Sequence, residues 1–299
     1  MEIVTFSDEM KLLIPEGAEL EKIASGFRFI EGPVWDDANK FLYFTDIPQN
    51  IVYRWSRPEG VSVFRTPSRH ANGLTLDGQR RLLACEHGSR TVTRTEQDGT
   101  ITELALQYDG KRLNSPNDIV VKSDGTLYFT DPPYGLKSVY GNQPEDKELS
   151  FQGVYRLDPE TAELRLLIDD FDKPNGLAFS PDEQILYVDD SARDHVRAFD
   201  VTPTGGLING RVFAELDPEA GKGVPDGMKV DAAGRLYVAG RGGIWIFSSS
   251  GQKIGIIKIP EITANLAWAE DYSHLYITAS TSLYRIRLNT RGIPVKHIN

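Results

Sequence analysis

Six residues that carry a side-chain oxygen stand at or near the start of similar short segments of the chain. Three of these segments read EGPVWD, NGLTLD and DGMKVD, and the other three follow the same pattern. The six residues are Glu31, Asn72, Asn117, Asn175, Asp226 and Asn265. Carboxylate and carboxamide oxygens are the ligands that hard cations such as Ca²⁺ and Mg²⁺ prefer. If the fold brings them together, they predict a site for a divalent cation.

Two of the six are carboxylates, and carboxylates that face each other out of water repel and raise each other's pKa. A divalent cation between Glu31 and Asp226 would remove that penalty. The alternative is a purely local role, because Asn and Asp are common turn residues, but it explains Glu31 poorly. Four protein ligands would leave open positions on Ca²⁺, which takes about six to eight.

The composition excludes several other chemistries. Cys85 is the single cysteine, so the chain lacks the ligands of a thiolate zinc site or an iron–sulfur cluster. The sequence contains neither the H-E-x-x-H spacing of metalloproteases nor the G-x-S-x-G turn of serine hydrolases. With 33 basic and 43 acidic residues the net charge is −10, which argues against a nucleic-acid partner.

The sequence shows no sign of a membrane segment or a secretory leader. No stretch approaches the roughly 20 apolar residues that span a bilayer. The first residues, MEIVTFSDEM, lack a basic region followed by an apolar run. We therefore expect a cytoplasmic protein without a membrane partner.

Two kinds of strand alternate along the chain and predict the elements that position the six oxygens. One kind reads FLYFTD (41–46), TLYFTD (126–131) and ILYVDD (185–190). The other lies upstream of each, and its six copies begin at residues 31, 72, 117, 175, 226 and 265. Repeats of about 40–50 residues with about four strands each are typical of propeller blades. The sequence predicts an all-β, six-bladed β-propeller that forms a single domain over residues 1–299, with the six oxygens at the mouth of its central channel.

Three segments lie outside this repeat. Residues 1–19 form an N-terminal extension, and LEKIASGFR (20–28) is placed to supply the outer strand of the last blade and close the ring. Residues 134–153 are polar and contain glycine and proline, which predicts a loop insert. The insert follows Asp131 directly, so we expect it at the same end of the propeller, either as a lid over the substrate or as a solvated surface loop.

Several of these motifs resemble the gluconolactonase/regucalcin (senescence-marker-protein) lactonases. The resemblance covers about residues 20–288 and rests on EGPVWD, NSPNDIVV, TLYFTDPPYG, KPNGLAFS and VPDGMKVD. That family is similar in turn to the paraoxonases and the squid-type phosphofluoridate hydrolases, which are six-bladed propellers with a catalytic divalent cation. The resemblance implies metal ligands at Glu31, Asn117, Asn175 and Asp226. It makes Ca²⁺ the first expectation, with Mg²⁺, Mn²⁺, Zn²⁺ or Fe²⁺ as alternatives.

The same resemblance suggests catalytic and substrate-binding roles. Asp226 is the first candidate for the base that activates water, and Asp131 is the second. Asn117 binds metal in some family members and substrate in others, so both roles stay open. His87 and Arg90 match a segment of the gluconolactonase branch, CEHGSRTVTR. His87, Arg90 and Asn72 are candidates for binding sugar hydroxyls. His87 and Arg90 could instead cap the end of a hairpin and pair with residues there.

These observations predict a metal-dependent hydrolase that opens the ester ring of a sugar lactone, with D-glucono-1,5-lactone as the first substrate to test. One alternative is a promiscuous lactonase or phosphotriesterase on the same propeller, which needs a more apolar channel lining. Another is a propeller that binds calcium without catalysis, because the same oxygens would serve for binding alone.

Overall fold

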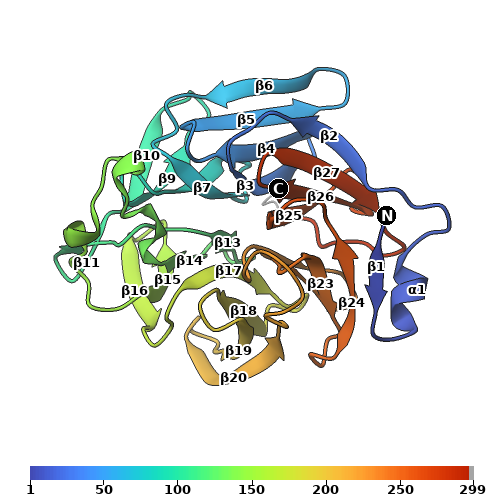
Figure 1. The fold of residues 1–299 in the computed structure, drawn as a ribbon. Helices are drawn as coiled ribbons and strands as arrows, with labels where there is room; N and C mark the ends of the chain where they lie inside the picture. The colour runs from blue at the N-terminus through green and yellow to red at the C-terminus, as the bar shows by residue number, and fades with distance from the viewer. Residues whose placement is uncertain (296–299) are drawn as a thin grey trace.

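The computed structural model describes residues 1–295 and confirms the predicted six-bladed β-propeller. Six antiparallel sheets stand around a central axis, and the chain runs through them in sequence order (Figure 1). Within each sheet the strands follow one another from the axis to the outside of the ring, as in the order β3-β4-β5-β6 of the first blade. The segments predicted as innermost strands do line the axis.

The strands of the blades fall into four positions. The innermost strands are β3 (Ile30–Asp36), β7 (Ala71–Leu76), β13 (Ile119–Val121), β17 (Pro174–Phe179), β21 (Met228–Val230) and β25 (Thr263–Ala269). The second strands are β4 (Phe41–Asp46), β8 (Leu82–Glu86), β14 (Leu127–Asp131), β18 (Ile185–Asp190), β22 (Leu236–Gly240) and β26 (His274–Ala279). The third strands are β5 (Ile51–Ser56), β9 (Thr91–Thr95), β15 (Gly153–Asp158), β19 (His195–Val201), β23 (Gly243–Phe247) and β27 (Ser282–Arg287). The outer strands are β6 (Gly60–Arg65), β10 (Ile101–Ala105), β16 (Glu163–Ile168), β20 (Leu207–Glu215), β24 (Lys253–Lys258) and β2 (Glu21–Ser25).

Burial follows the position of a strand within its blade. Every residue of β3 and β25 is buried, because neighbouring blades cover both faces of an inner strand. The outer strand β16 instead carries exposed residues among half-buried ones. The tyrosines of the second strands, such as Tyr128 and Tyr237, are fully buried between blades. Burial on both faces explains why the inner and second strands read as nearly continuous apolar runs.

The ring closes through the segment that the sequence identified. Strand β2 pairs antiparallel with β27, so the N-terminal part of the chain completes the last blade. Glu21 lies opposite Arg285 in this register, and its carboxylate accepts a hydrogen bond from the Arg285 guanidinium. This pairing leaves no free edge between the first and last blades.

The N-terminal extension adds to the fifth blade rather than lying apart from the propeller. Strand β1 (Ile3–Thr5) pairs with β24 as a fifth strand, and helix α1 (Glu9–Leu13) packs beside it. Met10 and Leu13 are buried in a cluster shared by the last two blades. The repeat could not predict this strand, because the other blades have no counterpart.

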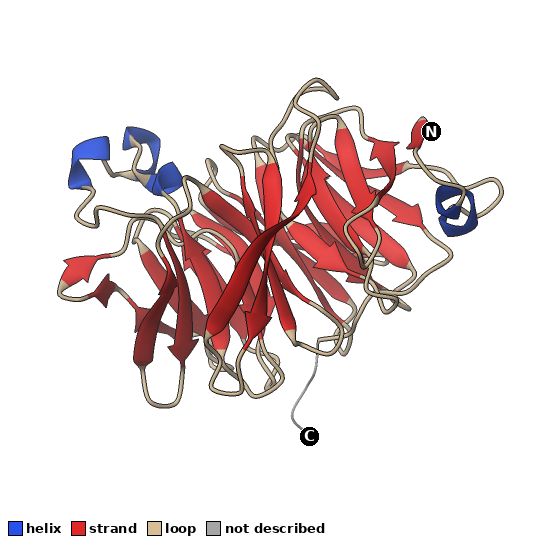
Figure 2. Ribbon diagram, turned by 90° about the horizontal axis from the view of Figure 1, so that it is seen from below, coloured by secondary structure: helices blue, strands red, loops and turns tan. Residues whose placement is uncertain are grey.

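The remaining elements lie between β10 and β15. They are the short hairpin β11 (Gln107–Tyr108) and β12 (Lys111–Arg112), and three 3₁₀ helices, η1 (Pro133–Gly135), η2 (Ser138–Tyr140) and η3 (Pro144–Asp146). The three 3₁₀ helices belong to the predicted insert and gather on one face of the ring (Figure 2). Helix α1 has five residues, and residues 1–295 contain no helix that could span a bilayer.

The extension should stabilise the propeller through α1. Met10 is 1% exposed, whereas Leu12 of the same helix is 73% exposed. Met10→Ala is expected to lower the free energy of unfolding by about 2–5 kcal/mol, because it opens a cavity in the core. The control Leu12→Ala is expected to change it by less than about 0.5 kcal/mol. Denaturant unfolding checks both, and equal small effects would show that the helix does not support the blades.

Candidate active site

A cavity of about 230 Å³ opens at the end of the channel where the innermost strands begin. Five of the six predicted oxygen-bearing residues line it, each from a different blade: Glu31, Asn72, Asn117, Asn175 and Asp226. Glu31, Asn72, Asn117 and Asn175 are buried, and Asp226 is half-buried. The cavity is smaller than the roughly 300–1,000 Å³ of drug-sized sites, so it suits a ligand of the size of a single sugar ring.

Glu31 is held so that one of its carboxylate oxygens remains for a ligand. Its Oε2 accepts hydrogen bonds from the Gly32 N–H at 2.5 Å and from the Asn265 Nδ2 at 3.0 Å. Asn265, the sixth predicted residue, is itself fixed because its Oδ1 accepts the Leu266 N–H at 2.8 Å. Asn265 therefore orients Glu31 instead of lining the cavity.

The backbone beside Glu31 requires glycine. Gly32 has φ of +51°, and a Cβ there would lie 2.1 Å from the carbonyl oxygen of Asn72. A bulge in the pairing of β3 with β4 falls at the same place. This close approach brings the first two blades together at the mouth and places Glu31 beside Asn72.

The amide of Asn175 is oriented by a chain of two hydrogen bonds. The Ser191 hydroxyl donates to the carbonyl of Pro225 at 2.6 Å, and it accepts from the Asn175 Nδ2 at 3.0 Å. Because the hydroxyl proton is already used, Ser191 takes the amide nitrogen and leaves Oδ1 of Asn175 for the cavity. Pro225 immediately precedes Asp226, so Ser191 also links the fourth and fifth blades at the site.

The two carboxylates of the cavity perturb each other. Burial, followed by the negative charge of Asp118, raises the pKa of Glu31 to about 7. Burial, followed by the charge of Glu31, raises the pKa of Asp226 well above its usual range. A bound cation would relieve this repulsion.

The side chains of the cavity fit a hard divalent cation that binds both carboxylate and carboxamide oxygens. Within residues 1–295, no three His, Cys, Asp or Glu side chains form a metal-binding group by themselves. A cation at the mouth would therefore need carboxamide oxygens beside its two carboxylates. Asn175 Oδ1 is oriented for that purpose, and Asn117 lines the same cavity. Such an oxygen set suits Ca²⁺ or Mg²⁺ better than zinc.

Asp131 lies behind the cavity, not in its wall. Its two carboxylate oxygens accept the backbone N–H groups of Asn114 and Ser115, both at 2.7 Å. The residue is completely buried, and burial raises its pKa to about 7 against the opposing effect of these two hydrogen bonds. The expectation that Asp131 reaches the mouth is therefore corrected: its carboxylate fixes the loop that leads to Asn117.

The same arrangement, a strand-end aspartate that accepts two backbone N–H groups, recurs in two other blades. Asp46 ends β4 and accepts the N–H groups of Arg28 and Phe29, three and two residues before Glu31. Asp190 ends β18 and accepts the N–H groups of Asp172 and Lys173, three and two residues before Asn175. An aspartate at the end of the second strand thus positions the residue that begins the first strand. The recurring TD and DD endings were the sequence signal for this role.

Arg90 also supports the loop before Asn117. It is 1% exposed, and its Nε donates to the carbonyl oxygens of Leu113 at 2.8 Å and Asn114 at 3.0 Å. It does not line the cavity. The Nε of Arg90 therefore serves the backbone of this loop, and the described structure places the residue outside the cavity wall, so a contact with substrate stays an untested expectation.

His87 and Asn72 do lie in the cavity wall, as a pair. The Asn72 Nδ2 and His87 Nε2 atoms are 3.2 Å apart, and the Asn72 Oδ1 has no partner within residues 1–295. Burial, followed by the positive charge of Lys137, lowers the pKa of His87 to about 3. The imidazole is therefore neutral at neutral pH and acts as a hydrogen-bonding group.

The sequence prediction missed two buried carboxyl groups behind the mouth. Asp118 accepts the N–H of Ile119 with Oδ1, and its Oδ2 has no partner in the described chain. Asp189 is completely buried, and neither of its oxygens has a partner there. Burial raises the pKa of both. The signal was present, because Asp118 stands next to Asn117, which the sequence analysis identified, and Asp189 belongs to the strand segment ILYVDD.

The insert forms part of the cavity wall. Tyr134, Lys137 and Tyr140 line the cavity, and the Asn142 Nδ2 ties the insert to the carbonyl oxygen of His87 at 2.9 Å. The Tyr140 ring also packs against the rings of His70 and His87. The insert is therefore placed to contact whatever fills the mouth.

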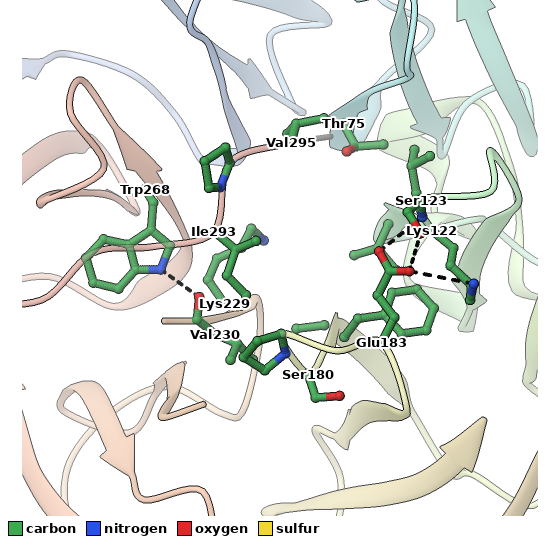
Figure 3. Close-up of a pocket in the computed structure, with 16 residues that line it drawn as sticks. Thr75, Lys122, Ser123, Ser180, Glu183, Lys229, Val230, Trp268, Ile293 and Val295 are labelled. Carbon is green, nitrogen blue, oxygen red and sulfur yellow. Dashed lines mark hydrogen bonds and ion pairs between the residues drawn. The ribbon is translucent and has the colours of Figure 1, made fainter. Parts of the chain in front are cut away.

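The opposite end of the channel has a different character. A cavity of about 160 Å³ there is lined by residues at the far ends of the inner strands, including Thr75 and Trp268, and by Ile293 and Val295 (Figure 3). The Trp268 indole donates to the carbonyl of Val230 at 3.1 Å. Residues 293–295 add apolar side chains to this end, and its charged lining residues are Lys122, Glu183 and Lys229. The pair of carboxylates and the carboxamides that line the mouth have no counterpart among the described residues of this cavity.

Several known proteins resemble this chain in sequence, and solved structures resemble it in fold. A gluconolactonase of Zymomonas mobilis is 34% identical to this chain, over 97% of the chain and 87% of that protein. Bovine regucalcin is 28% identical, over 88% of the chain and 85% of that protein. The solved structure of a gluconolactonase from Xanthomonas campestris superposes with a TM-score of 0.90 at 36% identity, and covers 96% of this chain and 95% of that one.

The family model of the SMP-30/gluconolactonase/LRE-like region matches residues 29–281, which run from just before Glu31 to the end of the last blade's second strand. The matched range contains all six oxygen-bearing residues and the insert. The chain belongs to the SMP-30/gluconolactonase/LRE-like family.

Proposed function

We propose that this chain is an enzyme that hydrolyses the ring ester of a sugar lactone at the mouth of the channel, with D-glucono-1,5-lactone as the reference substrate. The single observation that carries the proposal is the meeting of Glu31, Asn117, Asn175 and Asp226 in one cavity of sugar-ring size. The gluconolactonases of Zymomonas mobilis and Xanthomonas campestris support the same reaction class.

Glu31, Asn117, Asn175 and Asp226 would hold the divalent cation, Ca²⁺ in the first instance. When bound, such a cation polarises an ester carbonyl and stabilises the oxyanion that forms on it. The carboxylate of Glu31 and the amide of Asn175 are both held by hydrogen bonds, which supplies a preorganised site and lowers the cost of binding.

The residues of the chain supply the remaining steps. Asp226 takes a proton from the attacking water, whose oxygen bonds to the carbonyl carbon. The bond from that carbon to the ring oxygen breaks, and the proton passes to the released ring oxygen, which becomes a hydroxyl group. Asn117 holds the carbonyl in register, while Asn72 and neutral His87 hydrogen-bond the ring hydroxyls.

A lactonase or phosphotriesterase for less polar substrates is the nearest alternative, since Phe29, Ile47 and Val224 form an apolar part of the wall. A calcium-binding propeller without catalysis is the other. Proton release from a panel of sugar lactones, apolar lactones and phosphotriesters separates the three, because the proposal requires sugar lactones to react fastest and pure binding gives no turnover.

Removal of the cation or of one carboxylate should abolish turnover. Treatment with a chelator is expected to stop gluconolactone hydrolysis, and Ca²⁺ is expected to restore it. Glu31→Gln and Asp226→Asn are each expected to lower kcat/KM by about 100-fold or more while the propeller stays folded, because one formal charge leaves a two-carboxylate site. Full activity in a sample that metal analysis shows to be metal-free would contradict the proposal.

The stabilising effect of Ca²⁺ should depend on pH. The pKa of Glu31 rises from 4.5 to about 7 on folding, so the folded state favours the protonated carboxyl. The stability that Glu31 gives the metal-free protein is therefore fully present below about pH 4.5, and it is lost as the pH rises through about 7. Ca²⁺ binds the ionised carboxylates, so it should raise the Tm more near pH 8 than near pH 5. Thermal unfolding checks this, and a shift of equal size at both pH values would argue against binding at Glu31.

Asp131→Asn distinguishes a positioning residue from a base. In the variant, the side-chain NH₂ group of the introduced asparagine faces one of the two buried backbone N–H groups that donate to the carboxylate of Asp131. This mismatch is expected to cost about 1–3 kcal/mol of stability and to lower activity without a change in the pH–rate profile. Asp46→Asn removes the same kind of contact before Glu31 and should behave alike. Wild-type stability together with a shifted pH–rate profile in Asp131→Asn alone would instead make Asp131 a proton-transfer group.

A further inference from the structure

The wall of the cavity formed by the insert carries one positive charge. Among the described residues that line the cavity, Lys137 is the single cationic side chain, since His87 is neutral. It is exposed and stands between η1 and η2. Its ammonium group makes no ion pair or hydrogen bond with another residue within 1–295, whereas its backbone N–H donates to the carbonyl of Gly135.

Two of the three acidic residues of the insert, Asp146 and Glu148, are engaged elsewhere, and the third, Glu145, makes no ion pair with Lys137 in the described chain. The Asp146 carboxylate accepts the N–H of Gln143 at 2.7 Å, and the Glu148 carboxylate accepts the N–H of Arg112 at 2.9 Å. Neither forms an ion pair with Lys137. The charge of Lys137 is instead felt inside the cavity, where it contributes to the lowered pKa of His87.

The two sides of the cavity differ in charge. Glu31 and Asp226 come from the first and fifth blades, whereas Lys137 comes from the insert of the third blade. A lactone whose ester carbonyl faces the carboxylates therefore presents the remote part of its ring to the insert. Tyr134 and Tyr140 flank Lys137 in the same wall, and the Lys173 ammonium lies 5.9 Å from the centre of the Tyr134 ring.

An unpaired ammonium recognises charge more than it recognises hydroxyl groups. A lysine is a compact charge on a flexible stem, and an anionic acceptor adds Coulomb attraction to its hydrogen bond, which a neutral hydroxyl does not. The protein carries a net charge of −10, so an anionic substrate needs a local cation to enter this cavity. Lys137 is the residue that meets this need.

We propose that Lys137 is a specificity-determining residue that selects sugar lactones with an anionic group, a carboxylate or a phosphate, at the end of the molecule remote from the ester. This inference rests on the proposed lactonase function and names its substrate class. Carboxylate and phosphate share the chemistry that Lys137 recognises, and separate substrates distinguish them.

The test compares kcat/KM for three lactones: D-glucono-1,5-lactone, its 6-phosphate, and an aldaric acid monolactone that carries a carboxylate at C6. The variants are Lys137→Met, which removes the charge, and Lys137→Arg, which keeps it. Lys111→Met is the matched control, because Lys111 is an exposed lysine in the neighbouring β11–β12 hairpin and does not line the cavity.

The wild type is expected to prefer at least one anionic lactone over the neutral one. Lys137→Met is expected to lower the ratio of anionic to neutral kcat/KM by about fivefold to tenfold, mainly through KM. Lys137→Arg and Lys111→Met should keep most of the ratio, and added salt should reduce it in the wild type. An unchanged ratio in Lys137→Met would overturn the inference while leaving the lactonase function in place.

Failure of the proposed function gives a different result. If none of the lactones is hydrolysed, the lactonase proposal is wrong. Calorimetric binding of 6-phosphogluconate then decides the inference on its own: weaker binding by Lys137→Met than by the wild type supports it, and equal binding contradicts it.

Discussion

Two carboxylates from different blades, Glu31 and Asp226, share one cavity, and the charge of Glu31 raises the pKa of Asp226. Such a pair is unfavourable when both groups are ionised, and this constraint governs the architecture of the mouth. The structure holds the pair by fixing what surrounds it: Asn265 takes one oxygen of Glu31, and Ser191 fixes the amide of Asn175. The result is a polar cavity whose negative charge a cation would balance.

Ring closure and site geometry depend on each other. Glu31 belongs to the first blade and Asn265 to the last, and they are separated by 234 residues in sequence. Their hydrogen bond forms only when these two blades are neighbours, which requires β2 to complete the last blade. The strand-end aspartates then set the local register, because Asp46, Asp131 and Asp190 each hold the loop that delivers a mouth residue.

The repeat made the fold and the mouth residues predictable. Apolar strands with a period of about 40–50 residues fix the blade architecture, and the position that begins each inner strand is then common to all blades. The roles of Asp131 and Arg90 were not predictable in this way, because whether a buried polar group faces a cavity or a backbone N–H depends on loop conformation. Strand β1 was also missed, since a single added strand has no repeat signal. Asp189 was overlooked because its neighbour Asp190 is the member of the pair that follows the recurring pattern.

The central claim is that a divalent cation binds among Glu31, Asn117, Asn175 and Asp226. A crystal structure of the protein soaked with Mn²⁺, with anomalous diffraction data, and a second structure with Ca²⁺ test it most directly. The account predicts an anomalous peak between the Glu31 and Asp226 carboxylates, and Ca²⁺ at the same place with oxygen ligands at about 2.3–2.6 Å. Absence of a cation at this position, or a cation bound instead at Asp118 and Asp189, would contradict the account.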